Sequence, residues 1–275
     1  MERIPMSHAK AKGGTPRVSK SELVSHVVIP ARLASTRLPK KLLLSETGKP
    51  VIQHTYEAAL GADRPNGVTV AVDSQEMQRA VQSFGGTCVM TDPNLPSGTD
   101  RVAKVAEELA DVDIFVNVQG DEPEINAETI DAVVELLAEN VDAQIATLSV
   151  PIRDARRLND PNCVKVVRGS SGKALYFSRS PIPFIRDAGE DILQANPPIF
   201  HQHLGIYAYR REFLLRLNTL PCSDLESTEK LEQLRFLDAG FEIAVDTVNH
   251  GPKGIDTADD YAAFVARQLG GRRAA

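Results

Sequence analysis

Short apolar runs alternate with amphipathic segments along residues 24–150. The apolar runs are rich in β-forming residues and predict strands at 24–30, 68–72, 87–90, 114–119 and 143–150. The segments between them repeat apolar residues every three or four positions, which predicts helices at 50–60, 75–84, 99–110 and 127–138. Strands that alternate with helices of about ten residues are typical of a mostly parallel sheet.

The pattern changes after about residue 150. Two short runs, 164–168 and 175–178, flank Gly169-Ser-Ser-Gly172 and predict a β-hairpin. Further elements are expected as strands at 203–209 and 241–248 and as helices at 226–239 and 257–269. The last helix begins with Thr257 and Asp260 at the spacing of a capping box. Together these patterns predict an α/β fold with a Rossmann-like, mostly parallel central sheet and a smaller mixed β part.

The composition excludes several classes of protein. The 275 residues carry 31 Lys and Arg against 37 Asp and Glu, a net charge of −6, whereas broad nucleic-acid binding needs a basic face. No apolar stretch approaches the roughly 18 residues of a membrane helix, and three cysteines without a CxxC pair indicate a reducing compartment. We therefore expect a cytoplasmic protein with no nucleic-acid or membrane partner. Residues 1–23 are expected to form a flexible, basic and polar tail.

A basic loop follows the first predicted strand. It reads PARLASTRLPKK and places Arg32, Arg37, Lys40 and Lys41 within ten positions. Parallel sheets bind ligands at the carboxyl ends of their strands, and arginine and lysine are common partners of phosphate oxygens. The loop therefore suits a polyphosphate, although a solvated surface loop has the same composition. The chain contains neither GxxxxGK[ST] nor GxGxxG, so the common ATPase and dinucleotide motifs are absent.

Acidic residues occur at two further places. Asp121, in Asn117-Val-Gln-Gly-Asp-Glu-Pro123, directly follows a predicted strand and suits a hard cation such as Mg²⁺; an Asp in a tight turn is the alternative. Asp256, before the last helix, is a second candidate ligand, although the sequence alone does not show that it meets Asp121. The segment SGTDR at 97–101 opens a helix whose amides can receive an anion, or it simply carries its own N-cap.

Taken together, these segments resemble the sugar nucleotidyltransferases, and most closely the family of 3-deoxy-D-manno-octulosonate (Kdo) cytidylyltransferases. The matching segments follow the family's order and cover nearly all of residues 24–269. They are VVIPARLASTRLPKK at 27–41, SGTDR at 97–101, VNVQGDEP at 116–123, VKVV at 164–167, ALYFSRSPIP at 174–183, HLGIYAYR at 203–210, LEQLR at 231–235 and GIDTADD at 254–260. The family commonly has Gly and Pro where this chain has Lys40 and Leu42.

The resemblance implies a reaction and a set of residues. CTP and Kdo give pyrophosphate and CMP-Kdo, the activated sugar for lipopolysaccharide, with Mg²⁺ held by Asp121 and Asp256. Arg32, Arg37 and Lys41 join these two acids as catalytic residues. The implied nucleotide site comprises Ala31, Arg32, Ser35, Arg37, Lys41, Ser97, Gly98, Arg101 and Gln119. The implied sugar site comprises Arg179, Arg186, His203, Tyr207, Glu232 and Gln233.

The resemblance also implies an organisation in parts. A nucleotide-binding α/β part is expected at 24–150, a sugar-binding and dimerisation part at 151–250, and a segment that returns to the active site at 251–269. A homodimer built around residues 175–209 is implied. Two alternatives remain open: a cytidylyltransferase for another acidic sugar, such as sialic acid or 8-amino Kdo, and a nucleotide-binding protein without catalysis. Sialic acid enzymes usually have Gly-Gly-Ser-Lys at 34–37, whereas this chain has Ala-Ser-Thr-Arg, which favours Kdo.

Overall fold

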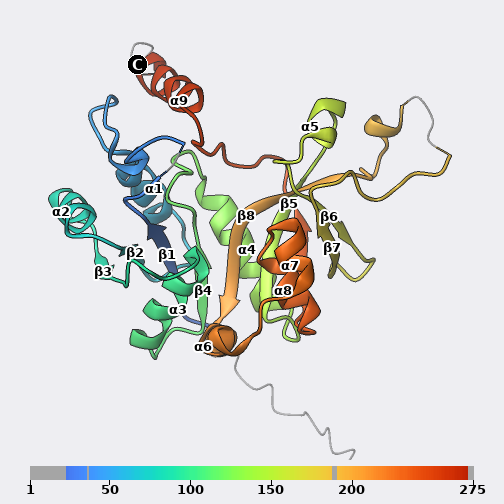
Figure 1. The fold of residues 1–275 in the computed structure, drawn as a ribbon, viewed down its shortest axis with the longest axis horizontal. Coiled ribbons are helices and arrows are strands. Elements are labelled where there is room, and N and C mark those ends of the chain that lie inside the picture. Colours follow the sequence, from blue (N-terminus) through green and yellow to red (C-terminus); the bar gives the residue numbers. More distant parts are fainter. Residues whose placement is uncertain (1–22, 36, 188–190, 272–275) are drawn as a thin grey trace, which may run out of the picture.

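The apolar runs assemble into one mixed sheet in the computed structural model, which describes residues 23–35, 37–187 and 191–271. The main path of this sheet has the order β3-β2-β1-β4-β8-β5-β9, and a β6-β7 hairpin joins it at β8 (Figure 1). The strands are β1 Ser25–Ala31, β2 Val68–Val72, β3 Cys88–Met90, β4 Ile114–Asn117, β5 Ile145–Pro151, β6 Lys165–Arg168, β7 Ala174–Ser178, β8 His201–Arg210 and β9 Ile243–Thr247. The helices are α1 Val51–Leu60, α2 Gln75–Ser83, α3 Gly98–Glu108, α4 Ala127–Glu139, α5 Ala155–Asn159, α6 Arg211–Arg216, α7 Asp224–Glu229, α8 Gln233–Asp238 and α9 Ala258–Gly271, with short 3₁₀ turns at η1 Lys41–Leu43, η2 Ile192–Gln194 and η3 Leu217–Thr219.

Most neighbouring strands of the main path are parallel, which confirms the predicted fold class. β3, β2, β1 and β4 run parallel to one another, and β9 runs parallel to β5. β8 is the exception, because it pairs antiparallel with β4 on one side and with β5 on the other. The predicted hairpin is present as β6 and β7, and Gly172 in its turn has a φ of +78°, in the region that favours glycine.

Helices cover both faces of the sheet, because successive residues of a strand point to opposite sides. Val27 and Ile29 of β1 pack into a core cluster with α1, α2, α4 and α9, whereas Val28 packs into a cluster with α3, α6 and α8. All three side chains are fully buried. The packed sheet therefore provides a firm base for the loops at its strand ends. Among the described helices, none combines the length and the apolar character needed to cross a membrane.

The second half of the chain departs from the predicted pattern in one helix. The single helix expected at 226–239 was wrong: α7 and α8 are separate, because Lys230 adopts a left-handed conformation with a φ of +54° and ends α7. Helices α5 and α6 lie where the sequence pattern predicts none. Of the tail expected at 1–23, only Leu23 is among the described residues.

Candidate functional site

A cavity of about 320 Å³ lies at the carboxyl ends of β1 and β4. The loop after β1, the start of α3 and the loop after β4 form its walls, so segments far apart in sequence meet there. Its lining comprises Pro30, Arg32, Ala34, Ser35, Arg37, Lys41, Leu42, Gly98, Gln119, Gly120 and Asp121. Most residues predicted to bind the nucleotide therefore surround one cavity.

Two contacts anchor the loop that follows β1. The Leu33 amide donates to both carboxylate oxygens of Asp73, at 3.0 and 3.2 Å, and Asp73 directly follows β2. Arg32 Nη2 donates to the Leu95 carbonyl at 2.8 Å. Ala31, the last residue of β1, is fully buried. The loop is thus tied to a neighbouring strand end and to the turn before α3.

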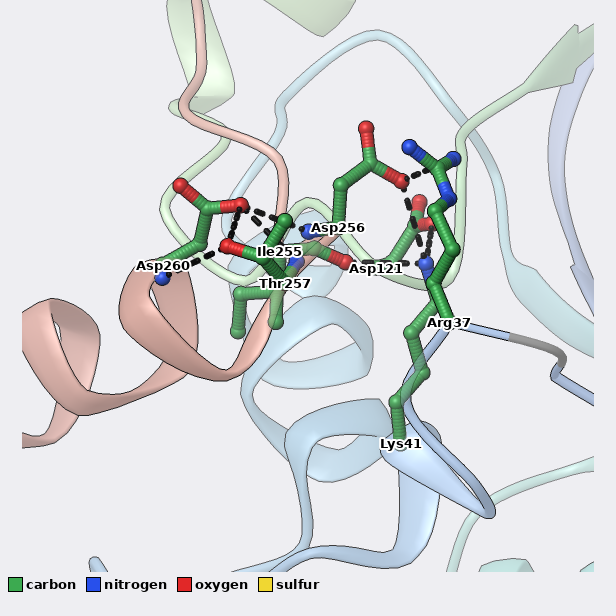
Figure 2. A network of polar contacts seen from close by, with 7 residues as sticks. All are labelled: Arg37, Lys41, Asp121, Ile255, Asp256, Thr257 and Asp260. Atoms are coloured by element: carbon green, nitrogen blue, oxygen red, sulfur yellow. Dashed lines mark hydrogen bonds and ion pairs between the residues drawn. The ribbon is translucent and has the colours of Figure 1, made fainter.

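Asp121 and Asp256, 135 positions apart in the sequence, meet at one ammonium group (Figure 2). Lys41 Nζ lies 2.5 Å from Asp121 Oδ2 and 3.6 Å from Asp256 Oδ1. Asp256 Oδ1 also accepts from Arg37 Nη2 at 2.7 Å. The structure therefore brings both candidate metal ligands within reach of a single ion, beside two cations of the basic loop.

The segment that carries Asp256 reaches this place because it is fastened to the first half of the chain. The Ile255 amide donates to the Asp121 carbonyl at 2.9 Å. Thr257 Oγ1 caps α9 as predicted, accepting from an amide of the first turn at 3.2 Å. Farther along α9, Arg267 donates two hydrogen bonds to Glu124, at 2.9 and 2.6 Å. These contacts tie α9 to the loop after β4.

The donors at this point fit a hard divalent cation. Mg²⁺ prefers oxygen ligands and usually takes one or two carboxylates, with water and substrate phosphates completing its coordination. Asp121 and Asp256 supply two such carboxylates. In the part of the chain that the structure describes, no group of three or more His, Cys, Asp and Glu side chains is placed to hold a metal. The arrangement suits a cation shared with a phosphorylated substrate better than a closed structural site.

Two residues predicted to bind the nucleotide serve the local structure around α3. Ser97 Oγ accepts from the Asp100 amide at 3.1 Å and the Asp100 carboxylate accepts from the Ser97 amide at 3.0 Å, which completes a capping box. Arg101 is fully buried and donates to Thr91 Oγ1 at 2.5 Å and to the Asp92 carbonyl at 3.0 Å. Burial lowers the pKa of Arg101. Direct contact of these two residues with a nucleotide stays a prediction.

Lys40, the fourth cation of the basic loop, pairs elsewhere. Its Nζ donates to both carboxylate oxygens of Glu76 on α2, at 2.7 and 2.9 Å. Its backbone has a φ of +51°, a left-handed conformation that favours glycine. A glycine, which is common at this position in the resembling family, would fit the same backbone conformation.

His203 and Tyr207, predicted for the sugar site, lie on β8. Their ring centroids are 5.2 Å apart, and His203 Nε2 lies 3.1 Å from Thr147 Oγ1. Burial lowers the pKa of His203 to about 3 and raises the pKa of Tyr207 well above its usual value, so both side chains are neutral at pH 7. This pair can offer hydrogen bonds to a sugar, but no charge.

Glu232 and Gln233 lie at the start of α8. The Thr99 hydroxyl on α3 donates to one carboxylate oxygen of Glu232, and Arg235 Nη2 donates to the other at 3.1 Å. Burial raises the pKa of Glu232. Gln233, the next residue, is buried. Glu232 therefore connects the helix that borders the cavity to the second half of the chain.

The two arginines predicted for the sugar site have different surroundings. Arg179, directly after β7, donates to the carbonyls of Glu229 and Pro161 at 2.7 and 2.9 Å, so it already binds protein groups. Arg186 is exposed on the segment that follows. The structure does not place these two arginines in the cavity lined by the basic loop.

A His203→Gln variant is expected to resist acid better than the parent chain. The imidazole pKa is about 3 in the folded state and about 6.5 when unfolded. As the pH falls below 6.5, the imidazole binds a proton in the unfolded state but not in the folded state. The free energy of unfolding therefore falls by up to about 1.4 kcal/mol per pH unit. Urea unfolding at pH 7, 6 and 5 measures this slope. The exposed His250 provides the control, and equal slopes in His203→Gln and His250→Gln would contradict the assignment.

Glu122 is a site residue that sequence reasoning missed. One of its carboxylate oxygens is buried and, among the described residues, has no hydrogen-bond partner. Burial, together with the negative charges of Asp121 and Asp256, raises its pKa to about 8. The signal was its position directly after Asp121, where the charge of the neighbouring carboxylate opposes ionisation of a second acid.

Known proteins resemble this chain over most of its length. The family model for cytidylyltransferases matches residues 26–243. A protein of Rhodopirellula baltica named 3-deoxy-manno-octulosonate cytidylyltransferase is 52% identical over 242 residues, which cover 88% of this chain and 97% of the relative. A protein of the same name from Chloroherpeton thalassium is 46% identical over 248 residues, which cover 88% and 98%. A solved structure described as CMP:2-keto-3-deoxy-manno-octonic acid synthetase complexed with CTP is 40% identical, with a TM-score of 0.83 and coverage of 90% of this chain and 98% of that one.

Proposed function

Because the chain belongs to the cytidylyltransferase family, we propose that it transfers the cytidylyl group of CTP to Kdo, giving CMP-Kdo and pyrophosphate. Relatives at 52% and 46% identity carry the name of this activity, and a structural neighbour at 40% identity is a complex with CTP. The observation in this chain that supports the proposal most directly is the meeting of Asp121 and Asp256 beside the basic loop. CMP-Kdo is the activated sugar for lipopolysaccharide, so the enzyme belongs to that biosynthesis.

In the proposed reaction, the anomeric hydroxyl of Kdo attacks the α-phosphorus of CTP in line. An O–P bond forms while the bond to the bridging oxygen breaks, pyrophosphate leaves with that electron pair, and the hydroxyl proton passes to solvent. Such a reaction needs alignment and charge neutralisation more than it needs a protein nucleophile. Arg32, Arg37 and Lys41 would hold the triphosphate, because they line the same cavity as Ser35 and Gln119. Ser35 would assist them, and Gln119 would face the cytidine.

Mg²⁺ is the proposed cofactor, held by the carboxylates of Asp121 and Asp256. When bound, it would supply a Lewis acid that neutralises phosphate charge and lowers the pKa of the attacking hydroxyl. Arg37 and Lys41 would neutralise the charge that develops on the leaving pyrophosphate, since both already lie at the acidic pair.

The sugar is proposed to bind against β8 and the start of α8. His203 and Tyr207 would donate hydrogen bonds to the sugar hydroxyl groups or accept hydrogen bonds from them, because both side chains are neutral. The carboxylate of an acidic sugar needs a cation, and Arg179 and Arg186 are the candidates. Since Arg179 is engaged with backbone carbonyls, the exposed Arg186 has the greater freedom to reach a ligand.

The experiment that tests the activity measures pyrophosphate release from CTP, ATP, GTP and UTP with a panel of acidic sugars. Turnover is expected with CTP and Kdo. Faster turnover with sialic acid or 8-amino Kdo would instead identify that sugar as the substrate. If calorimetry shows that CTP binds while no sugar is turned over, the chain is a nucleotide-binding protein without catalysis.

An Arg37→Ala variant is expected to lose about a hundredfold in kcat/KM for CTP, the usual cost of removing one donor that stabilises transition-state charge. The Arg37 side chain is 64% exposed, so its loss leaves the fold intact. Steady-state pyrophosphate release measures the effect. Arg79→Ala, which removes an exposed arginine of α2, is the matched control. An unchanged kcat/KM for Arg37→Ala would refute its role.

A homodimer in the cytoplasm completes the proposal. Leu175 and Phe184 are large apolar side chains that are 62% and 89% exposed, and contact with a second chain would remove them from water. They lie in the region 175–209 that the family resemblance assigns to dimerisation. The three cysteines are unpaired, which suits a reducing compartment, and the net charge of −6 favours neither nucleic acid nor an acidic membrane surface. Light scattering is expected to give twice the mass of one chain; the mass of one chain at micromolar concentration would contradict the dimer.

A further inference from the structure

Lys41 lies at the point where the two acidic residues meet. Only 14% of its side chain is exposed, compared with 64% for Arg37. Its Nζ faces three oxygens: Asp121 Oδ2 at 2.5 Å, the Ile255 carbonyl at 2.8 Å and Asp256 Oδ1 at 3.6 Å (Figure 2). Carboxylate and carbonyl oxygens are also the ligands of hard cations. The ammonium group is therefore surrounded as a bound metal ion would be.

The formal charges of this cluster balance. Lys41 and Arg37 contribute two positive charges, and Asp121 and Asp256 contribute two negative charges at 2.5 and 2.7 Å from them. A divalent ion at the same oxygens would lie next to the ammonium group, and like charges a few ångströms apart repel each other strongly. Metal binding to both carboxylates therefore requires the Lys41 ammonium to move.

A nucleotide triphosphate offers these cations another partner. Phosphate oxygens carry several negative charges and form short, charge-assisted hydrogen bonds with lysine and arginine. The same side chains line the cavity next to the acids, so they can turn to phosphate without a change of fold. Once Lys41 turns to phosphate, Asp121 and Asp256 keep an uncompensated charge that attracts a divalent ion.

We propose that Lys41 is the built-in counter-ion of Asp121 and Asp256, and that nucleotide phosphates must draw it away before a divalent cation binds there. This inference rests on the proposed function and gives Lys41 a second role, the control of metal loading. Phosphate and metal binding then favour each other, and thermodynamic linkage makes this coupling equal in both directions. Each half of the competition can be measured without the other ligand.

The first experiment measures Mn²⁺ binding without nucleotide, by electron paramagnetic resonance of free Mn²⁺. Lys41→Met is expected to bind Mn²⁺ about tenfold more tightly than the parent chain, a coupling of ordinary size. Lys40→Met is the matched control, because Lys40 pairs with Glu76 and not with the acidic pair. A double Lys41→Met, Asp121→Asn variant is expected to lose the gain, which shows where the ion binds. Equal Mn²⁺ affinity in Lys41→Met and the parent chain would overturn the proposal.

The second experiment measures CTP binding by calorimetry in EDTA, so that metal is absent. Asp121→Asn is expected to bind CTP several-fold more tightly than the parent chain, because Lys41 no longer has to leave a charged partner. Glu76→Gln, which releases Lys40 in the same way, is the control. An affinity for CTP that is unchanged or lower in Asp121→Asn counts against the proposal.

The parent enzyme separates this inference from the proposed function. If it releases pyrophosphate from CTP and Kdo while the variants bind Mn²⁺ and CTP as the parent does, only the role of Lys41 as counter-ion is lost. If the parent releases none with any sugar, the proposed function itself fails. Circular dichroism of each variant confirms that a change in binding does not come from unfolding.

Discussion

An Asp121→Asn variant is expected to fold normally and to lose about a thousandfold or more in kcat. Asparagine keeps the shape of the side chain and can still accept a hydrogen bond from Lys41, so the loop after β4 stays in place. The variant lacks the negative charge that a divalent cation needs. Removing one hydrogen-bond donor that stabilises transition-state charge lowers kcat by about 10²–10³-fold, and loss of a metal ligand is expected to lower kcat further. Pyrophosphate release at saturating CTP and Kdo measures kcat, and circular dichroism reports the fold.

Asp256→Asn is expected to behave in the same way, because its carboxylate meets the same ammonium group. Glu76→Gln serves again as the control for a lost carboxylate, since its partner is Lys40 and not Lys41 or Arg37. Turnover by this control is expected to match that of the parent. Near-normal pyrophosphate release by either aspartate variant would remove that residue from the proposed metal site.

An Arg101→Met variant is expected to lose about 3 kcal/mol in the free energy of unfolding, which for a chain of this size lowers Tm by roughly 6–12 °C. The Arg101 guanidinium is fully buried and donates to Thr91 Oγ1 and to the carbonyls of Asp92 and Pro93. Methionine has a similar length, but it leaves these acceptors without their donor. Thermal unfolding measures the loss. Arg79→Met, at an exposed position of α2, is expected to change stability by less than about 0.5 kcal/mol.

The same variant distinguishes two roles for Arg101. The turn that Arg101 holds also supplies the Leu95 carbonyl that anchors Arg32, so a structural role predicts lower stability together with weaker CTP binding. Direct recognition of the nucleotide predicts weaker CTP binding with an unchanged Tm. Weaker CTP binding together with an unchanged Tm would therefore support the role implied by the family resemblance.

The parallel part of the sheet was predictable because its elements carry local signals. Asn126, for example, accepts from the Thr129 amide at 3.0 Å and starts α4 where the sequence indicates. The split between α7 and α8 carries no such signal, because Lys230 takes a conformation that usually marks glycine. Helix boundaries were predicted correctly where the residue type at the boundary signals a start or an end. They were missed where a residue without such a signal ends the helix.

The candidate site was predictable only in part, for a similar reason. Arg32, Arg37 and Lys41 occupy one loop, so their proximity is a local property of the sequence. The approach of Asp256 to Asp121 depends on how α9 packs against the first half of the chain, which no local pattern contains; only the family resemblance suggested it. The burial of Arg101 was not predicted, because an arginine in the first turn of a helix is ordinarily exposed, and only the tertiary contacts of its turn explain that burial.

The position of β8 also has a consequence for synthesis of the protein. β8, formed by His201–Arg210, separates β4 from β5 and pairs with both. In a nascent chain that ends before residue 201, β4 lacks its partner β8, and β5 lacks both of its partners, β8 and β9. Such unpaired strand edges invite association with other chains. The pairing of β4 and β5 with β8 is therefore complete only after Arg210 has left the exit tunnel of the ribosome.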